Sequence, residues 1–250
     1  MSVPAAVKSE IQTIGGAFMF SREAKAFGAS TGVNGFIGPY TRGRAGVLGD
    51  VDADVVTAAF GFFEPGTVRA AWESVPMPPA QAAAGYLAAC QDFGRRKLAD
   101  FDACDRLAGL LQAVVDAADV AGLGLFAGWR ALPLAGDTPG RVLQLIHCLR
   151  ELRGGIHLIA VRAGGLSPFE AVLIGGSPLA DGPTQARRFG WGECVDAAEV
   201  TDAMRTRWAE AEALTDELIA PAFAALDEPA AKELITLLQD AHAAVFAPQG

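Results

Sequence analysis

Two histidines and two arginines lie close together near the middle of the chain. His147, Arg150, Gly154 and His157 are three, four and three residues apart, so a continuous helix would present them on one face. Arg153 precedes His157 by four residues and can approach it. A histidine beside arginines suits acid–base chemistry or the binding of an anion. We therefore predict His157 as a catalytic residue and His147, Arg150 and Arg153 as ligand-binding residues.

The alternative is that these residues form a solvated polar face. Gly154 and Gly155 argue against it, since each glycine costs about 1 kcal/mol in a helix interior relative to alanine. Either the helix breaks there, or a ligand or a neighbouring helix approaches closely. Glu170 is a further candidate ligand-binding residue, as a partner of Arg153 or His157, and otherwise a surface residue.

A second cluster lies in a glycine-rich segment, residues 35–46. Arg44 and Arg42 could grip a carboxylate or phosphate there, because the guanidinium fork makes two parallel hydrogen bonds. Tyr40 adds a phenol and is our second predicted catalytic residue. In the structural alternative, Arg44 pairs with one of the aspartates that follow it, Asp50, Asp52 or Asp54. We expect Tyr40 and Arg44 to meet His157 only if the two halves of the chain pack face to face.

The elements that would position these residues are helices. Apolar side chains step by four, three, four, three and four residues from Leu145 to Ala163, which is a helical period. Residues 80–99 are rich in alanine, and residues 200–218 and 228–246 are amphipathic. The glycines of residues 35–46 indicate a turning backbone or close packing. We predict an all-α fold of two closely packed helical lobes, with domains at 1–134 and 135–250.

Composition limits the function classes. The net charge is −9, and residues 193–250 alone contain 12 acidic and 3 basic side chains. Such a chain is a poor non-specific ligand for nucleic acid, which binds through many lysines and arginines. No stretch has the length and apolarity of a membrane span, and we find no signal peptide, so we expect a cytoplasmic protein.

Metal and cofactor sites have little support in the sequence. The cysteines, Cys90, Cys104, Cys148 and Cys194, form no Cys-x-x-Cys motif, and we expect them to be reduced and buried. No metal-binding histidine pair is present, so we predict no metal site. The cofactor is unknown, with haem ligation by a histidine as one alternative.

The chain resembles a large actinobacterial family described as helix-turn-helix related. The resemblance rests on Leu149-Arg150-Glu151-x-Arg153-Gly154-Gly155-x-His157 with Gly165-Leu166 and Phe169-Glu170-Ala171, and on Tyr40-x-x-Gly43-Arg44-Ala45-x-x-Leu48-Gly49. Residues 200–238 are similar to the C-terminal helices of MarR-like winged-helix regulators. The resemblance implies that the second lobe is a degenerate winged-helix-like domain, because residues 181–191, in the place of a recognition helix and wing, are short.

Three function classes follow. The first is a small-molecule-binding protein or enzyme whose His/Arg/Tyr site takes an anionic ligand. The second is a MarR-like regulator that binds DNA as a dimer through Arg187 and Arg188. The third is a non-catalytic helical module that binds a protein partner. The two long C-terminal helices suit a homodimer interface, although a helix buries an apolar face within its own chain equally well.

Overall fold

The computed structural model describes residues 2–178 and 180–247, and within them the chain is all-α, as predicted. The helices are α1 (Val3–Ala17), α2 (Arg22–Ser30), α3 (Ile37–Ala45), α4 (Ala53–Phe60), α5 (Pro65–Ser74), α6 (Pro79–Lys97), α7 (Cys104–Ala117), α8 (Gly124–Arg130), α9 (Thr138–Ala163), α10 (Pro168–Gly175), α11 (Gly182–Arg188), α12 (Gly192–Val195), α13 (Asp202–Phe223) and α14 (Glu228–Phe246), with 3-10 turns η1 (Phe18–Phe20) and η2 (Gly46–Leu48). Extended pairing in this part of the chain is limited to one isolated bridge, Ser177 with Ala180.

Local sequence explains where the helices begin. The Asp137 carboxylate accepts a hydrogen bond from the Gly140 backbone N–H at the start of α9, and Asp227 does the same for Ala230 at the start of α14. Ser167 and Glu170 form a reciprocal capping box at the start of α10. The apolar period expected over Leu145–Ala163 lies in α9, which is continuous through Gly154 and Gly155.

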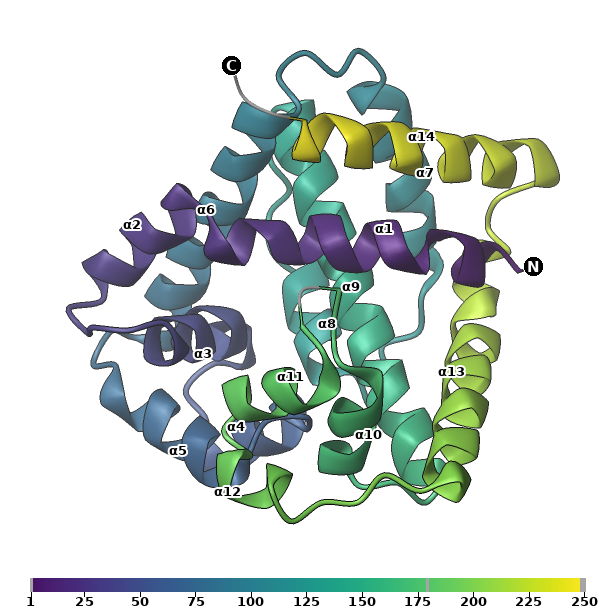
Figure 1. Cartoon of the computed structure of the whole chain (residues 1–250). Helices are drawn as coiled ribbons and strands as arrows, with labels where there is room; N and C mark the ends of the chain where they lie inside the picture. The colour runs from purple at the N-terminus through teal and green to yellow at the C-terminus, as the bar shows by residue number, and fades with distance from the viewer. Residues whose placement is uncertain (1, 179, 248–250) are drawn as a thin grey trace.

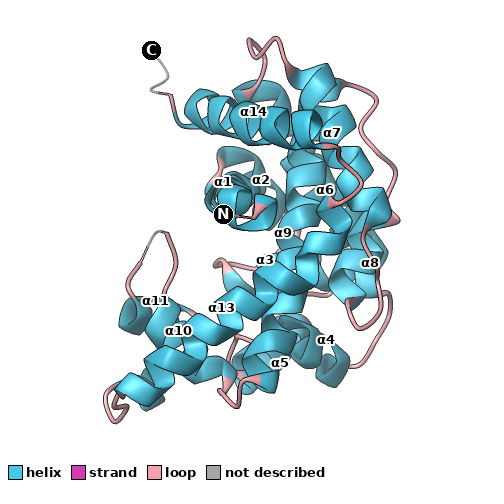
Figure 2. Ribbon diagram, turned by 90° about the vertical axis from the view of Figure 1, so that its right-hand side faces the viewer, coloured by secondary structure: helices cyan, strands magenta, loops and turns pink. Residues whose placement is uncertain are grey.

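Helix α9 is the centre of the molecule. It packs against α1, α6, α7, α8 and α13, so neighbours surround it on most sides. Figure 1 shows α1 crossing in front of α9 and α14 lying alongside α1, while α10, α11 and α12 lie at the opposite end. Figure 2, turned by 90°, shows the same separation of α14 from α10 and α11. The main apolar core includes residues from α1 to α9 and from α13 and α14. The division at residues 134 and 135 stays a prediction.

The glycine-rich segment is helical and closely packed. A Cβ on Gly43 of α3 would lie 2.8 Å from the Tyr86 Cβ, and a Cβ on Gly46 would lie 2.3 Å from the Pro79 carbonyl oxygen. These glycines therefore allow α3 and η2 to lie directly on α6. Of the two alternatives that the sequence left open, close packing is correct for Gly43 and Gly46, and a turn of the backbone for Gly35, whose φ is 93°.

Two further observations complete the fold. Cys90, Cys104 and Cys148 are buried as expected, but Cys194 is exposed, because it lies in the one-turn helix α12 at the surface. Among the described residues no single helix has the length and apolarity to cross a bilayer, and α9 with α10 meets that requirement only jointly, across a bend of 112°.

Candidate functional site

The face of α9 that carries His147, Arg150 and Arg153 is largely covered by other helices, and of these three residues Arg150 is the most exposed. His147 is fully buried, and Arg153 and Glu151 are 5% and 2% exposed. The expected polar surface is therefore an internal one, because other helices cover it. Its side chains divide into two groups: those near Glu151, which face α3 and α6, and those near Arg153, which face α13.

The first group is built around an ion pair between α3 and α9. Arg44 Nε and Nη2 donate to Glu151 Oε1 and Oε2 at 2.9 and 2.8 Å, with side-chain exposures of 11% and 1%. Burial alone would raise the pKa of Glu151, but the charge and hydrogen bonds of Arg44 outweigh it and lower that pKa to about 2. The expected pairing of Arg44 with an aspartate at 50, 52 or 54 is wrong, because Arg44 is turned inward toward α9.

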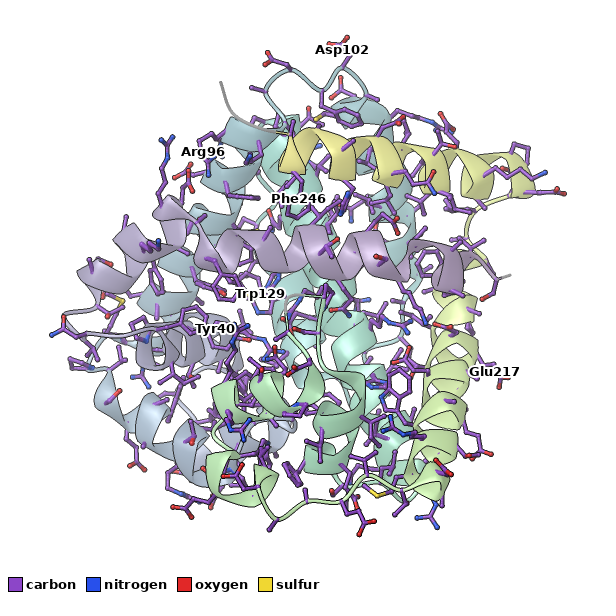
Figure 3. All side chains as sticks on the ribbon, in the orientation of Figure 1. Tyr40, Arg96, Asp102, Trp129, Glu217 and Phe246 are labelled. Carbon is purple, nitrogen blue, oxygen red and sulfur yellow. The ribbon has the colours of Figure 1, made fainter. Side chains whose placement is uncertain are left out.

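His147 lies beside this pair in an aromatic shell. Its ring is 4.5 Å from that of Trp129 and 5.2 Å from that of Phe18, both edge to face. Burial lowers its pKa to about 4, although the nearby charge of Glu151 opposes the shift. The imidazole is therefore neutral near pH 7. Figure 3 places Trp129 and Tyr40 inside the molecule, whereas Asp102 and Glu217 lie at its edge.

Several polar atoms around this pair have no hydrogen-bond partner in the described structure. They are the Tyr86 and Thr41 hydroxyls, Arg150 Nε and both ring nitrogens of His147, although the Gly15 backbone lies near that ring and favours its protonated form. The His147 Nε2 lies 3.7 Å from Glu151 Oε1, beyond hydrogen-bond distance. Buried polar atoms are normally bonded, and leaving one unbonded costs about 1–3 kcal/mol. This group therefore has hydrogen-bonding capacity available for a ligand.

Two hollows adjoin the group. The larger, which we call the aromatic pocket, has a volume of about 350 Å³ and lies between α2, α3 and α6. Its lining includes Lys25, Phe27, Phe36, Tyr40 and Tyr86. The smaller, which we call the arginine cavity, has a volume of about 100 Å³ and adjoins Arg44, Glu151 and Gly154. Tyr40 and Arg44, one helical turn apart on α3, each line a different hollow.

The second group joins α9 to α13. Arg153 donates to Asp216 at 2.6 Å and to Glu212 at 3.0 Å. His157 Nδ1 lies 2.9 Å from the Thr215 hydroxyl and 3.5 Å from a Glu212 oxygen. We call this group the α13 clamp.

Neither side chain of α9 in the clamp lines the two hollows. Burial lowers the pKa of His157, and the charge of Glu212 opposes that shift. Phe62 stacks on the His157 ring at 5.6 Å. His157 therefore does not meet Tyr40 and Arg44 at one site; Arg44 meets Glu151 instead.

Comparison with known proteins identifies the family of this chain. A family model described as a helix-turn-helix family matches residues 5–250. The chain belongs to this family. No curated protein and no solved structure matches it. The match confirms the helix-turn-helix relationship expected from the sequence, while the actinobacterial origin and the likeness to MarR-like regulators stay predictions.

In this helix-turn-helix protein, α10 and α11 are short consecutive helices that pack against each other. Arg187 and Arg188, near the end of α11, are exposed, and Arg187 pairs with Asp196 at 2.6 Å. The Glu170 carboxylate is used in the capping box of α10, accepting from the Ser167 N–H at 2.7 Å. Because this carboxylate is used for helix capping, we do not include Glu170 in the candidate site.

Arg42 lies apart from Arg44 in this member of the family. Its Nε donates to the Met77 carbonyl oxygen at 2.7 Å, and its guanidinium lies 4.1 Å above the Trp72 ring. Arg42 thus ties α3 to the segment that precedes α6. It is absent from the lining of both hollows.

Two residues of the site, Glu151 and Tyr86, were not identified from the sequence. Glu151 lies four residues after His147, a spacing that places both on one face of a helix, and this was a usable signal. Tyr86 lies in the alanine-rich segment, and no pattern distinguishes it from a core aromatic residue. Its ring contacts those of Tyr40, Trp129 and His147 at 5.9–6.4 Å.

Proposed function

We propose that this helix-turn-helix family member binds a small organic anion with an aromatic or apolar body in the aromatic pocket. The proposal rests on the residues that line that pocket. They are mostly aromatic or apolar, and Lys25 is the one charged side chain among the described lining residues. Its volume of about 350 Å³ lies within the usual range of small-molecule sites, about 300–1,000 Å³.

The walls suit a flat apolar ligand. Phe36 stacks on Tyr40 at 5.1 Å, and Phe20 also stacks on Phe36, at 5.3 Å. Phe20 and Phe36 are 55% and 47% exposed, so this stack continues from the wall of the pocket to the protein surface. Aromatic faces of this kind contribute area and stacking energy to a planar ligand.

Polar groups are few and placed apart from one another. Lys25 is exposed at the pocket, and Tyr40 and Tyr86 are 6% and 2% exposed within it. The Tyr86 hydroxyl has no partner in the described structure. A ligand with one anionic group for Lys25 and an apolar body for the rings matches this arrangement. In this proposal Tyr40 is a wall of the binding site rather than a proton donor.

The test is a fluorescence titration with two related probes. Anilinonaphthalene sulfonate is an aromatic anion, and N-phenylnaphthylamine has the same ring system without the charge. We expect Lys25→Gln to weaken sulfonate binding by about tenfold and to leave the neutral probe unchanged, because only the charge is removed. Ala29→Trp, which places an indole at an exposed lining residue, should weaken both probes.

The matched control is Lys97→Gln, which removes the same charge outside the pocket and should change neither affinity. If Ala29→Trp leaves both affinities unchanged, the probes bind elsewhere and the proposal fails. If Lys25→Gln and Lys97→Gln weaken the sulfonate equally, the preference for an anion at Lys25 is wrong.

A second candidate function is duplex DNA binding, favoured by the family assignment and by the exposed arginines of α11. Against it stand the acidic charge and the pairing of Arg187 with Asp196. Binding at low salt that weakens on Arg188→Ala, but not on Arg22→Ala at the exposed start of α2, would support it. The absence of any retention at low salt would reject it.

A further inference from the structure

The charges around the arginine cavity do not balance. Glu151 accepts from Arg44 at 2.9 and 2.8 Å and lies 3.4 Å from Arg150 Nη1, so one carboxylate serves two guanidinium groups. No other acidic group of the described residues pairs with either arginine. Arg150 is partly exposed, with 23% of its side chain accessible, whereas Arg44 is nearly buried. A buried cation without a full counter-charge is unfavourable.

The neighbouring titratable groups cannot supply the missing negative charge. His147 has its pKa lowered by burial and is neutral near pH 7. Burial raises the pKa of Tyr86 well above its usual value, so this phenol stays protonated. The group formed by Arg44, Arg150 and Glu151 therefore carries one net positive charge.

One nitrogen of Arg44 makes no hydrogen bond to the described part of the protein. Glu151 uses Nε and Nη2, and Arg44 Nη1 has no hydrogen bond within the described structure. Arg44 and the Glu151 carboxylate paired with it line the cavity, and the rest of the lining includes the apolar side chains of Phe60, Leu123 and Leu158. In such surroundings a guanidinium nitrogen is a strong donor to an anion, since little water competes.

Gly154 supplies a second, independent indication. It lies inside α9, where glycine is less favourable than alanine by about 1 kcal/mol. A Cβ built on Gly154 would meet nothing within 4 Å, so packing does not require glycine there. The neighbouring Gly155 differs, because its Cβ would lie 2.8 Å from Leu123 Cδ2. Gly154 lines the arginine cavity and keeps this space open.

We propose that the arginine cavity is a binding site for a small monovalent anion of a few atoms, such as formate or nitrate, held by Arg44. The cavity has less than a third of the volume of the aromatic pocket, which excludes the larger organic anion proposed there. The site is separate from that pocket and does not depend on its function. The anion accepts a hydrogen bond from Arg44, and it partly offsets the surplus positive charge of the group, although Arg150 lies outside the lining of the cavity.

The experiment measures thermal unfolding against the concentration of sodium formate or nitrate at constant ionic strength, with sodium sulfate as the bulkier, divalent anion. A ligand that binds only the folded chain raises its stability with a saturating dependence. We expect saturation with formate and nitrate but not with sulfate. Gly154→Leu, which fills the cavity, should abolish the saturating response.

Gly109→Leu is the matched control. Gly109 also lies within a helix and has open space at its Cβ, but it is exposed on α7 and outside the cavity. It should retain the response of the unmodified protein. Loss in both variants, or retention in both, overturns the proposal, and so does an absence of saturation in the unmodified protein.

Glu151→Gln tests the charge argument. Removing the carboxylate leaves Arg44 without its counter-charge, so the affinity for formate should rise by about tenfold or more. A formate affinity that is unchanged or lower in this variant would contradict the site, because the anion would not be in contact with Arg44.

Discussion

Helix α9 carries a histidine and an arginine in each of its two halves, and the structure uses the two pairs differently. In the α13 clamp, Arg153 has two acidic partners and His157 has a hydroxyl partner. At the Glu151 group, two arginines share one acid, and the ring nitrogens of His147 have no side-chain partner among the described residues. The clamp is a completed structural connection, whereas the Glu151 group keeps unused donors beside a cavity. Similar residue types on one helix therefore do not imply a similar role.

The largest expected effect comes from breaking the Arg44–Glu151 pair. Glu151→Ala should lower the free energy of unfolding by about 3–5 kcal/mol, because it leaves Arg44 buried without its partner. Urea denaturation would measure this loss. A loss below about 1 kcal/mol would show that water reaches Arg44 and that the pair is not buried in solution.

Breaking the α13 clamp should lower the free energy of unfolding by less than breaking the Arg44–Glu151 pair. Arg153→Ala leaves Asp216 without a partner, whereas Glu212 keeps its ion pair with Lys8 at 3.1 Å. The Glu212 and Asp216 side chains are 22% and 16% exposed and remain partly hydrated. We expect a loss of about 2 kcal/mol by the same measurement. The control is Arg106→Ala, whose surface pair with Glu233 should contribute less than about 1 kcal/mol. If Arg153→Ala and Arg106→Ala lower the free energy of unfolding equally, the α13 clamp is no stronger than a surface ion pair.

The two histidines should differ in pH dependence. The pKa of His147 falls from 6.5 to about 4 on folding, so below pH 6.5 the unfolded chain takes up a proton that the native chain does not. Stability should therefore fall as pH falls, by about 1–1.5 kcal/mol between pH 6.5 and roughly pH 5. Glu151, with a pKa of about 2, contributes only below about pH 4.5.

Denaturation of His147→Gln and His157→Gln across that range would separate the two groups. The His147 variant should lose most of the pH dependence, and the His157 variant a smaller part, because His157 keeps a hydroxyl and a carboxylate nearby. A larger change in the His157 variant would reverse our assignment of which histidine is buried without partners.

The smallest expected effects concern the two glycines at the border between the groups. Gly154→Ala should stabilise the protein by about 0.5–1 kcal/mol, because its methyl group enters open space and the helix gains propensity. Gly155→Ala should be neutral or destabilising, since Leu123 must move. Thermal unfolding of both variants measures the difference. If both substitutions stabilise the protein, the Leu123 side chain moves aside at little cost in free energy.

Helices could be predicted from the sequence, but the residues that pack around them could not. The period from Leu145 to Ala163 predicted α9 correctly, because helical periodicity is a local property. The burial of its polar face could not be predicted, since it depends on helices distant in the sequence, such as α1, α3 and α13. The partner of Arg44 lies 107 residues away, and the nearby aspartates were the only local alternative. The residues predicted for one site thus lie in separate places.

The position of α1 has a consequence for synthesis. This first helix packs against α9, α13 and α14, all made much later. At about 5–20 residues per second, the interval from the end of α1 to the start of α14 is roughly 10–40 s. During that time the apolar side chains Val7, Ile11 and Ile14, which are buried in the finished protein, lack their final cover. Helix α1 is thus made well before the helices that protect its apolar face from aggregation.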